Sequence, residues 1–136
     1  MNQDITDYHI DSLVRFSGPN TCLINLPEYP IDDDDFHQAA ALTHRILEQE
    51  GISVQVIPEP NRKRVKDIDF VASYANYYVC NNAVIAAEFG DKETDEIALN
   101  SLQKHYPDRD IVTLNVDTLG ELGGGIHCAT HEMPKV

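Results

Sequence analysis

The stretch GGGIHCAT, residues 123–130, decides how the rest of the chain is understood. Its three consecutive glycines give the backbone a freedom, including positive φ, that other residues adopt only at a cost. They are followed by Ile126, His127 and Cys128. A nucleophilic cysteine benefits from such a hinge, because the backbone can approach a bound ligand while the sulfur is held in place. The structural alternative is a glycine turn before an ordinary buried cysteine, since free cysteines are often buried.

A second polar group lies near the N-terminus, in the sequence DITDYHID of residues 4–11. His9 and Asp11 are two residues apart, and on a strand this spacing puts both side chains on one face. Histidine carries protons near neutral pH. An ionised aspartate can hold two N–H groups of a guanidinium through parallel hydrogen bonds. Together with Cys128, these residues predict attack by a cysteine on a cationic substrate.

Both segments resemble the agmatine deiminase and bacterial-type peptidylarginine deiminase family. GGGIHCATHEMP is similar to the family's nucleophile motif, and DITDYHIDSLVRF is similar to its catalytic His-x-Asp segment. Between them, residues 72–91 (ASYANYYVCNNAVIAAEFGD), the helix that follows and residues 106–119 (YPDRDIVTLNVDTL) resemble the family's usual approach to the cysteine. The likeness extends along nearly the whole chain, in the family's order.

The resemblance implies the α/β fold of the penteins, which is the α/β-propeller of guanidino-group-modifying enzymes. We expect a single domain over residues 1–136, the C-terminal part of such a propeller, with ββαβ-like repeat units at about 10–80 and 81–136. The sequence also suggests the repeat by itself. A strand, an acidic loop, an amphipathic helix and a further strand occur at 21–57 and again at 83–116.

The resemblance also implies hydrolytic deimination of a guanidinium, either agmatine to N-carbamoylputrescine and ammonia or peptidylarginine to citrulline. Cys128 would be the nucleophile that forms a covalent thiouronium, and His9 would be the acid and base. Asp11 would be catalytic and would bind the guanidinium, with Gly124 and Gly125 letting the backbone approach the substrate. No cofactor and no metal are expected. Agmatine suits the acidic balance of the chain better than an arginine peptide does.

Two other functions remain open. The family's N-terminal units carry a further guanidinium-binding aspartate, so the chain is alternatively a catalytically incomplete fragment or an assembly module. The open flanks of a partial propeller favour a homo-oligomer or pairing with a complementary N-terminal chain. The second alternative is a metal-binding hydrolase with ligands from His9, Asp11, His127, Cys128 and His131. Otherwise His127 is expected to pack in the core or to support the site residues from behind, because neighbours on a strand point to opposite faces.

Composition limits the class of protein. The 136 residues, 42% hydrophobic and 24% charged, are typical of a globular domain. A formal charge of −13 argues against nucleic-acid binding, which needs a basic surface. No apolar run approaches the ~20 residues of a membrane helix, and no export signal is evident. A cytoplasmic protein without membrane contact is therefore expected. Three cysteines do not suggest a disulfide framework, and Cys22 and Cys80 are expected in the core.

Hydrophobic periodicity predicts the secondary structure. Strands are expected at 13–16, 21–26, 52–57, 83–89 and 110–116, with an extended, aromatic run at 71–80. One helix should follow the four aspartates of residues 32–35, which complement its N-terminus better than they suggest a metal site, and should end at Gly51. A second helix is expected at 94–105, with inward side chains at Ile97, Ala98, Leu102 and Tyr106. The basic loop at 61–66 should be solvated surface.

Overall fold

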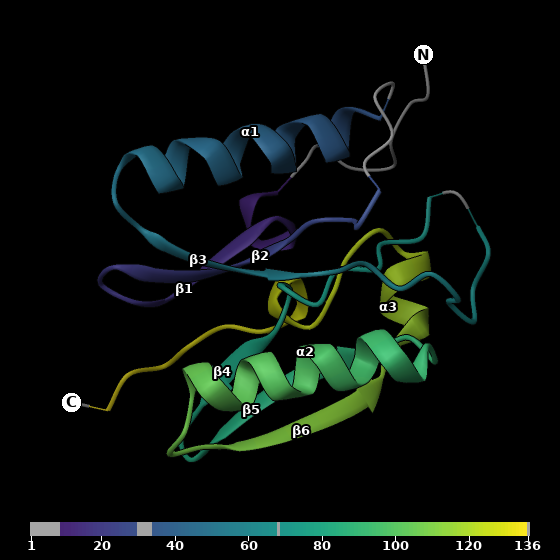
Figure 1. Ribbon diagram of the computed structural model, residues 1–136. Coiled ribbons are helices and arrows are strands. Elements are labelled where there is room, and N and C mark those ends of the chain that lie inside the picture. The colour runs from purple at the N-terminus through teal and green to yellow at the C-terminus, as the bar shows by residue number, and fades with distance from the viewer. Residues whose placement is uncertain (1–8, 30–33, 68, 136) are drawn as a thin grey trace.

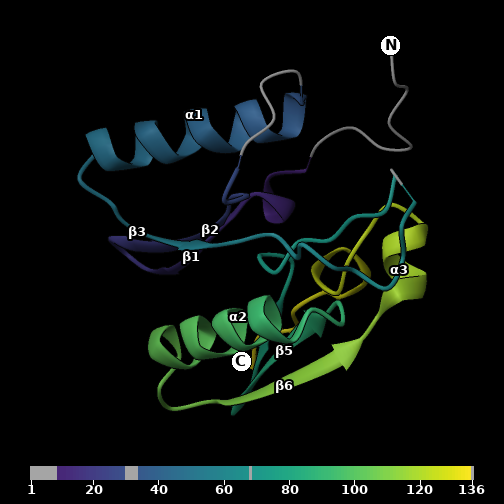
Figure 2. The ribbon, with the colours of Figure 1, turned by 45° about the vertical axis from the view of Figure 1, so that its right-hand side comes forward.

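The computed structural model describes residues 9–29, 34–67 and 69–135. Figure 1 and Figure 2 show four layers from top to bottom, namely α1, the sheet β1-β2-β3, α2 and the sheet β4-β5-β6. The elements are η1 (Ile10–Ser12), β1 (Val14–Gly18), β2 (Thr21–Asn25), α1 (Asp35–Gln49), β3 (Ser53–Ile57), β4 (Tyr78–Cys80), β5 (Ala83–Glu88), α2 (Lys92–His105), β6 (Asp110–Asn115), α3 (Asp117–Glu121) and η2 (His127–Ala129). Residues 4–8 of the N-terminal motif and residues 32–33 of the acidic run lie outside the described residues.

The two sheets have the same topology. In the first, β1 and β2 are antiparallel and β3 runs parallel to β2. In the second, β4 and β5 are antiparallel and β6 runs parallel to β5. Each parallel connection passes through a helix, α1 in the first sheet and α2 in the second, as is usual for such crossovers. The chain is therefore a mixed α/β protein with two small mixed sheets.

The ends of α1 follow the local signals in the sequence. The Asp34 side chain accepts a hydrogen bond of 3.0 Å from the backbone N–H of His37 and so caps the first turn. Gly51, with φ of 74°, takes the left-handed conformation that commonly ends a helix. Among the described residues of the acidic run, Asp34 is the one that precedes α1, and its role is to cap the helix.

β2 is apolar on both faces because helices lie on both sides of its sheet. Cys22 and Ile24 pack in one cluster with Ala40 of α1. Leu23, which points the other way, belongs to a second cluster with Leu102 of α2. Cys22 is fully buried, which confirms its expected place in the core and raises the pKa of its thiol.

The expectation of an extended run over residues 71–80 is wrong except at β4. Side-chain hydrogen bonds hold the preceding residues in an irregular, buried segment. The backbone N–H of Tyr74 donates to Asn25 Oδ1 at 3.0 Å, and Ser73 Oγ donates to the Ser12 carbonyl at 2.6 Å. The expectation for Ile97 is also wrong. It is 39% exposed, because α2 turns the side that carries Ala98 toward the core.

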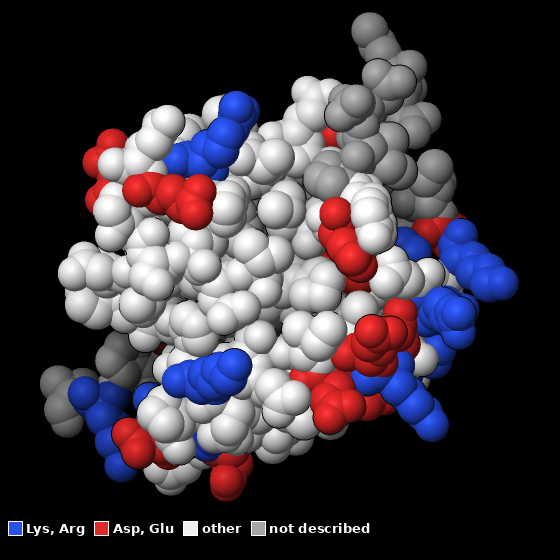
Figure 3. Space-filling model, viewed as in Figure 1, with Lys and Arg blue, Asp and Glu red and all other residues white. Residues whose placement is uncertain are grey.

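The surface carries both signs of charge. On the face seen in Figure 3, acidic and basic side chains gather at the upper left and along the right-hand and lower edges and leave the centre largely uncharged. In the basic loop, Arg64 Nε donates to Asp117 Oδ2 at 2.7 Å. Most of that loop is exposed, as expected. Among the described residues, no helix is both long enough and apolar enough to cross a membrane.

Candidate active site

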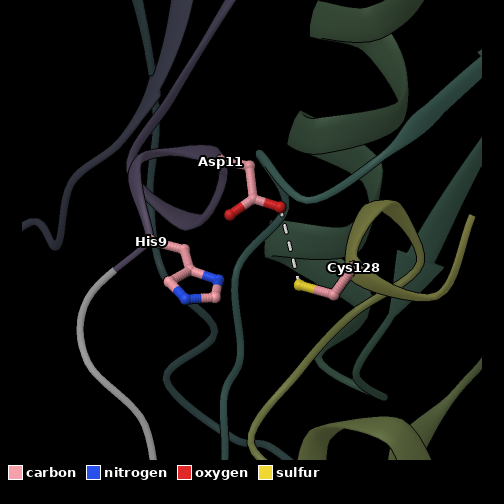
Figure 4. Close-up of side chains that lie close together, drawn as sticks. All are labelled: His9, Asp11 and Cys128. Atoms are coloured by element: carbon pink, nitrogen blue, oxygen red, sulfur yellow. Dashed lines mark hydrogen bonds between the residues drawn. The ribbon is translucent and has the colours of Figure 1, made fainter. Parts of the chain in front are cut away.

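Side chains from the two ends of the described chain meet at one place. His9 and Asp11 of the η1 segment approach Cys128 of η2 (Figure 4), and ligand atoms of the three side chains all lie within 4.8 Å of one another. The thiol of Cys128 lies 3.5 Å from Asp11 Oδ2, to which it donates. His9 and Cys128 are exposed, whereas the Asp11 side chain is only 13% exposed. A thiol, an imidazole and a carboxylate therefore lie together at a surface open to solvent.

The backbone reaches this arrangement by a different route from the one expected. His9 and Asp11 do not lie on a strand, because residues 10–12 form a 3₁₀ turn in which the N–H of Ser12 donates to the His9 carbonyl at 3.1 Å. Cys128 likewise lies in a 3₁₀ turn. Since successive residues of such a turn are about 120° apart, neighbours need not point to opposite faces. The strand argument for His127 is therefore wrong.

His127 contacts the same carboxylate as Cys128. Its Nδ1 lies 2.6 Å from Asp11 Oδ2. The other oxygen, Asp11 Oδ1, is buried and has no hydrogen-bond partner within the described part of the chain. Burial alone would raise the pKa of the Asp11 carboxyl, but hydrogen bonds from His127 and Cys128 and the nearby His9 outweigh it, and the pKa lies below its ordinary value of 3.8. Asp11 is thus ionised at neutral pH.

Asn76 is the residue of the site that the sequence reasoning missed. It is 2% exposed, and its Nδ2 donates to Cys128 Sγ at 3.3 Å and to Ser12 Oγ at 3.4 Å. Its Oδ1 accepts from the backbone N–H of His127 at 2.9 Å. A single amide inside an aromatic run was the available signal, because buried amides require hydrogen-bond partners.

The glycines before Cys128 have different surroundings. Gly123 has φ of 79°, which favours glycine. A Cβ on Gly125 would lie 2.3 Å from Asn76 Oδ1, so a side chain there would displace the amide. A Cβ on Gly124 would lie at an ordinary distance of 3.5 Å from Cys128 Cβ. Gly125 thus allows the contact with Asn76, and its approach to a substrate stays a prediction.

The residues that could hold a metal ion form a smaller set than the one expected. Of the described side chains, His9, Asp11 and Cys128 make up the cluster with ligand geometry, and neither His127 nor His131 is part of it. The cluster offers one nitrogen, one oxygen and one sulfur, a mixture that Zn²⁺ accepts.

Known proteins resemble the chain in sequence and in fold. A Streptomyces coelicolor protein, provisionally named an agmatine deiminase, is 31% identical over 96% of this chain and 40% of its own length. The agmatine deiminase of Medicago truncatula is 28% identical over 98% of this chain and 42% of its own. The solved agmatine deiminase of C. jejuni matches with a TM-score of 0.77 at 27% identity, over 90% of this chain and 38% of that one.

The chain therefore spans about two fifths of the length of these relatives. Its mixed α/β architecture is the fold of the matched part of an agmatine deiminase. The model of the Porphyromonas-type peptidyl-arginine deiminase family matches residues 1–134, almost the whole chain. The chain belongs to the Porphyromonas-type peptidyl-arginine deiminase family.

Proposed function

We propose that this chain hydrolyses the guanidinium group of a small cation to a ureido group and releases ammonia, with Cys128, His9 and Asp11 as catalytic residues. The observation that carries the proposal is the buried Asp11 Oδ1, which has no partner among the described residues and whose carboxylate lies beside the Cys128 sulfur. A buried oxygen without a hydrogen bond is costly. A guanidinium N–H would satisfy it through a charge-assisted bond.

In this reaction the guanidinium carbon is attacked twice. His9 first takes the proton of the Cys128 thiol, the thiolate then forms an S–C bond to the carbon, and the C–N bond to the departing amine breaks. His9 gives that amine a proton, so that it leaves as ammonia, and then takes a proton from a water molecule. The resulting hydroxide forms a C–O bond, the S–C bond breaks, and the ureido product and the thiolate remain.

Asp11 binds the substrate less symmetrically than a bidentate pair would. Its Oδ2 already accepts from His127, and from Cys128 until the thiol loses its proton, which leaves Oδ1 for the guanidinium. His127 therefore orients the carboxylate in this proposal, and Asn76 holds the sulfur and the turn that carries it. Both act through another residue and are positioning residues.

Agmatine is the substrate that we favour over an arginine peptide. The formal charge of −13 attracts a small dication, and the curated relatives carry the name agmatine deiminase. We further propose that the chain supplies two ββαβ units of a pentein propeller and that a complementary polypeptide shapes the far end of the pocket. The proposal rests on the matched share of the relatives' length.

The test is formation of the ureido product from agmatine, free arginine and an arginine peptide. Cys128→Ala should abolish product formation. Cys80→Ala, which changes a half-buried cysteine away from the site, should leave it unchanged and serves as the matched control. If the wild-type chain forms no product from any of the three, hydrolysis by this chain alone is excluded, and the chain is then an assembly module without turnover of its own.

A metal-binding hydrolase is the second candidate, which the cluster of His9, Asp11 and Cys128 supports. Metal content of the purified protein separates the two functions. Stoichiometric zinc that is lost in both His9→Ala and Cys128→Ala would favour metal chemistry. Full activity after dialysis against a chelator would favour the cysteine nucleophile.

A further inference from the structure

Asn25, the last residue of β2, contacts both halves of the candidate site from the protein interior, where it is 0% exposed. Its backbone N–H donates to the Leu13 carbonyl at 2.8 Å, directly after the turn that carries Asp11. Its side-chain Oδ1 accepts from the backbone N–H of Tyr74 at 3.0 Å, two residues before Asn76. One residue therefore connects the segment that carries the carboxylate with the segment that bonds the sulfur.

β2 gives these contacts a firm support. It is the central strand of its sheet and pairs with β1 on one edge and with β3 on the other. Asn25 itself is paired with Ile57 of β3, which is also 0% exposed. Because central, buried strands open less readily than irregular segments do, the two halves of the site take their position from β2 rather than the reverse.

Glu59 fixes the orientation of the Asn25 amide. Asn25 Nδ2 donates to Glu59 Oε1 at 3.3 Å, and Glu59 Oε2 lies 3.4 Å from Nε2 of His37 on α1. The side chains of Glu59 and His37 are 26% and 11% exposed. An ionised carboxylate only accepts hydrogen bonds, so it faces the NH₂ group of the amide and leaves Oδ1 directed at the Tyr74 N–H.

We infer that Asn25 is a positioning residue that holds the segment of residues 73–76 where Asn76 bonds Cys128 and His127. The Asn76 amide donates to the sulfur at 3.3 Å and accepts from the His127 N–H at 2.9 Å. A displacement of this segment would therefore alter both contacts.

The buried N–H of Tyr74 is the point through which Asn25 acts. A buried backbone donor requires an acceptor. Without Asn25 Oδ1, the N–H stays unsatisfied or the segment shifts, and a shift reaches Asn76 two residues later. The effect on the reaction rate rests on the proposed function, whereas the effect on the segment does not.

Amide hydrogen exchange, followed by NMR, tests the inference without turnover. Relative to the amides of β5, Asn25→Ala should accelerate exchange about tenfold at Tyr74 and about three- to tenfold at His127. The Tyr74 amide loses its acceptor directly. The His127 amide does not contact Asn25, and both of its acceptors belong to Asn76. A purely local role of Asn25 would accelerate the Tyr74 amide alone.

An exchange of donor and acceptor gives a matched pair of variants. In Asn25→Asp/Glu59→Gln, the aspartate accepts from the Tyr74 N–H and from the new side-chain amide, whose oxygen faces His37. Both amides should exchange within about twofold of the wild type. Asn25→Ala/Glu59→Gln lacks the acceptor and should behave as Asn25→Ala does. Ile24→Val, which removes a methyl group from the adjacent buried position of β2, is the packing control and should leave both ratios unchanged.

Two results of the exchange measurement would overturn the inference. One is a His127 amide that keeps the wild-type ratio in Asn25→Ala while the Tyr74 amide is accelerated. The other is equal acceleration in the two double variants, provided that both keep the wild-type circular dichroism spectrum.

Turnover gives a second readout if the wild-type chain forms product. Asn25→Ala should lower kcat about three- to tenfold and change KM less than about twofold, because the backbone bond to Leu13 and the free oxygen of Asp11 are retained. An unchanged kcat in an active chain would contradict the inference. If the wild-type chain forms no product, the proposed reaction fails, and the exchange ratios still decide the role of Asn25.

Discussion

Gly125→Ala should disrupt the site through a single methyl group. The added Cβ would lie 2.3 Å from Oδ1, 2.6 Å from Cγ and 3.0 Å from Cβ of Asn76. Real Cβ atoms essentially never come that close to a neighbour, so either the turn or the amide must move. Asn76 is 2% exposed and has no room to swing into solvent.

The size of the effect follows from what the amide holds. Overpacking a filled interior costs about 1–3 kcal/mol. Losing the hydrogen bonds of Asn76 to the His127 N–H and to Cys128 Sγ adds about 1 kcal/mol each. With partial relaxation we expect a loss of about 2–4 kcal/mol in the free energy of unfolding. At an m-value of about 2 kcal/mol/M, the urea midpoint falls by about 1–2 M.

Gly124→Ala is the matched control, because its Cβ would make ordinary contacts of 3.5 Å and 3.8 Å with Cys128. Urea titrations followed by circular dichroism should leave its midpoint close to that of the wild type. Asn76→Ala removes the amide that the new Cβ would strike. Gly125→Ala should therefore cost much less stability in a chain that already carries Asn76→Ala than in the wild type. Equal midpoints for Gly124→Ala and Gly125→Ala would refute the reasoning.

Three further predictions follow from the hydrogen bonds and charges. His127→Ala removes a hydrogen bond that lowers the pKa of Asp11, so the acid limb of the pH–rate profile should move to higher pH. The stability that the ionised carboxyl contributes should likewise be lost at a higher pH than in the wild type. Rates and urea midpoints from acid to neutral pH measure this, with Asp11→Asn as the control that lacks the carboxylate. Burial raises the pKa of Tyr74 and of Tyr77 well above 10.0, so the contribution of these two phenols to stability should be constant below that pH and should fall above it, where the unfolded chain ionises first. Urea titrations with tyrosinate absorbance at increasing pH check this. Arg64→Ala should cost about 0.2–1 kcal/mol at low salt and less at high salt, because the ion pair is partly exposed.

The order of helices and strands could be predicted because its signals are local. Gly51 adopts the expected left-handed conformation after α1, and Asn82 has φ of 66° at the expected turn. The second helix begins at Lys92, two residues before its expected start, because Asp91 rather than a later residue takes the N-cap position. Burial alternates along the first four residues of β5, which reflects the period of two that strands impose, whereas β2 is buried on both faces.

The irregular segment before β4 could not be predicted in this way. Residues 73–77 have the aromatic content of a strand, but their hydrogen-bond partners lie far away in sequence. Tyr74 is bonded to Asn25, and Asn76 to residues at both ends of the chain. The local sequence around residues 73–77 contains none of these partners, so its aromatic, strand-forming residues alone favoured a strand there.

The candidate site was predictable as a set of residue types but not as a geometry. His9, Asp11 and Cys128 stand out by their chemistry, and the fold brings them within 4.8 Å of one another. The reason given for pairing His9 with Asp11 assumed a strand, whereas the chain forms a 3₁₀ turn. The same assumption pointed His127 to the opposite face from Cys128, although both side chains contact Asp11 Oδ2.

Two independent connections hold the ends of the chain together at this site. One is the Asp11 carboxylate, which contacts His127 and Cys128 directly. The other is the buried segment of residues 73–76, whose Ser73 and Asn76 bond Ser12 on one side while Asn76 bonds Cys128 on the other. Because the second connection uses neither oxygen of Asp11, the sulfur stays in place whatever the carboxylate binds. A carboxylate that need not hold the fold together is available to hold a cation.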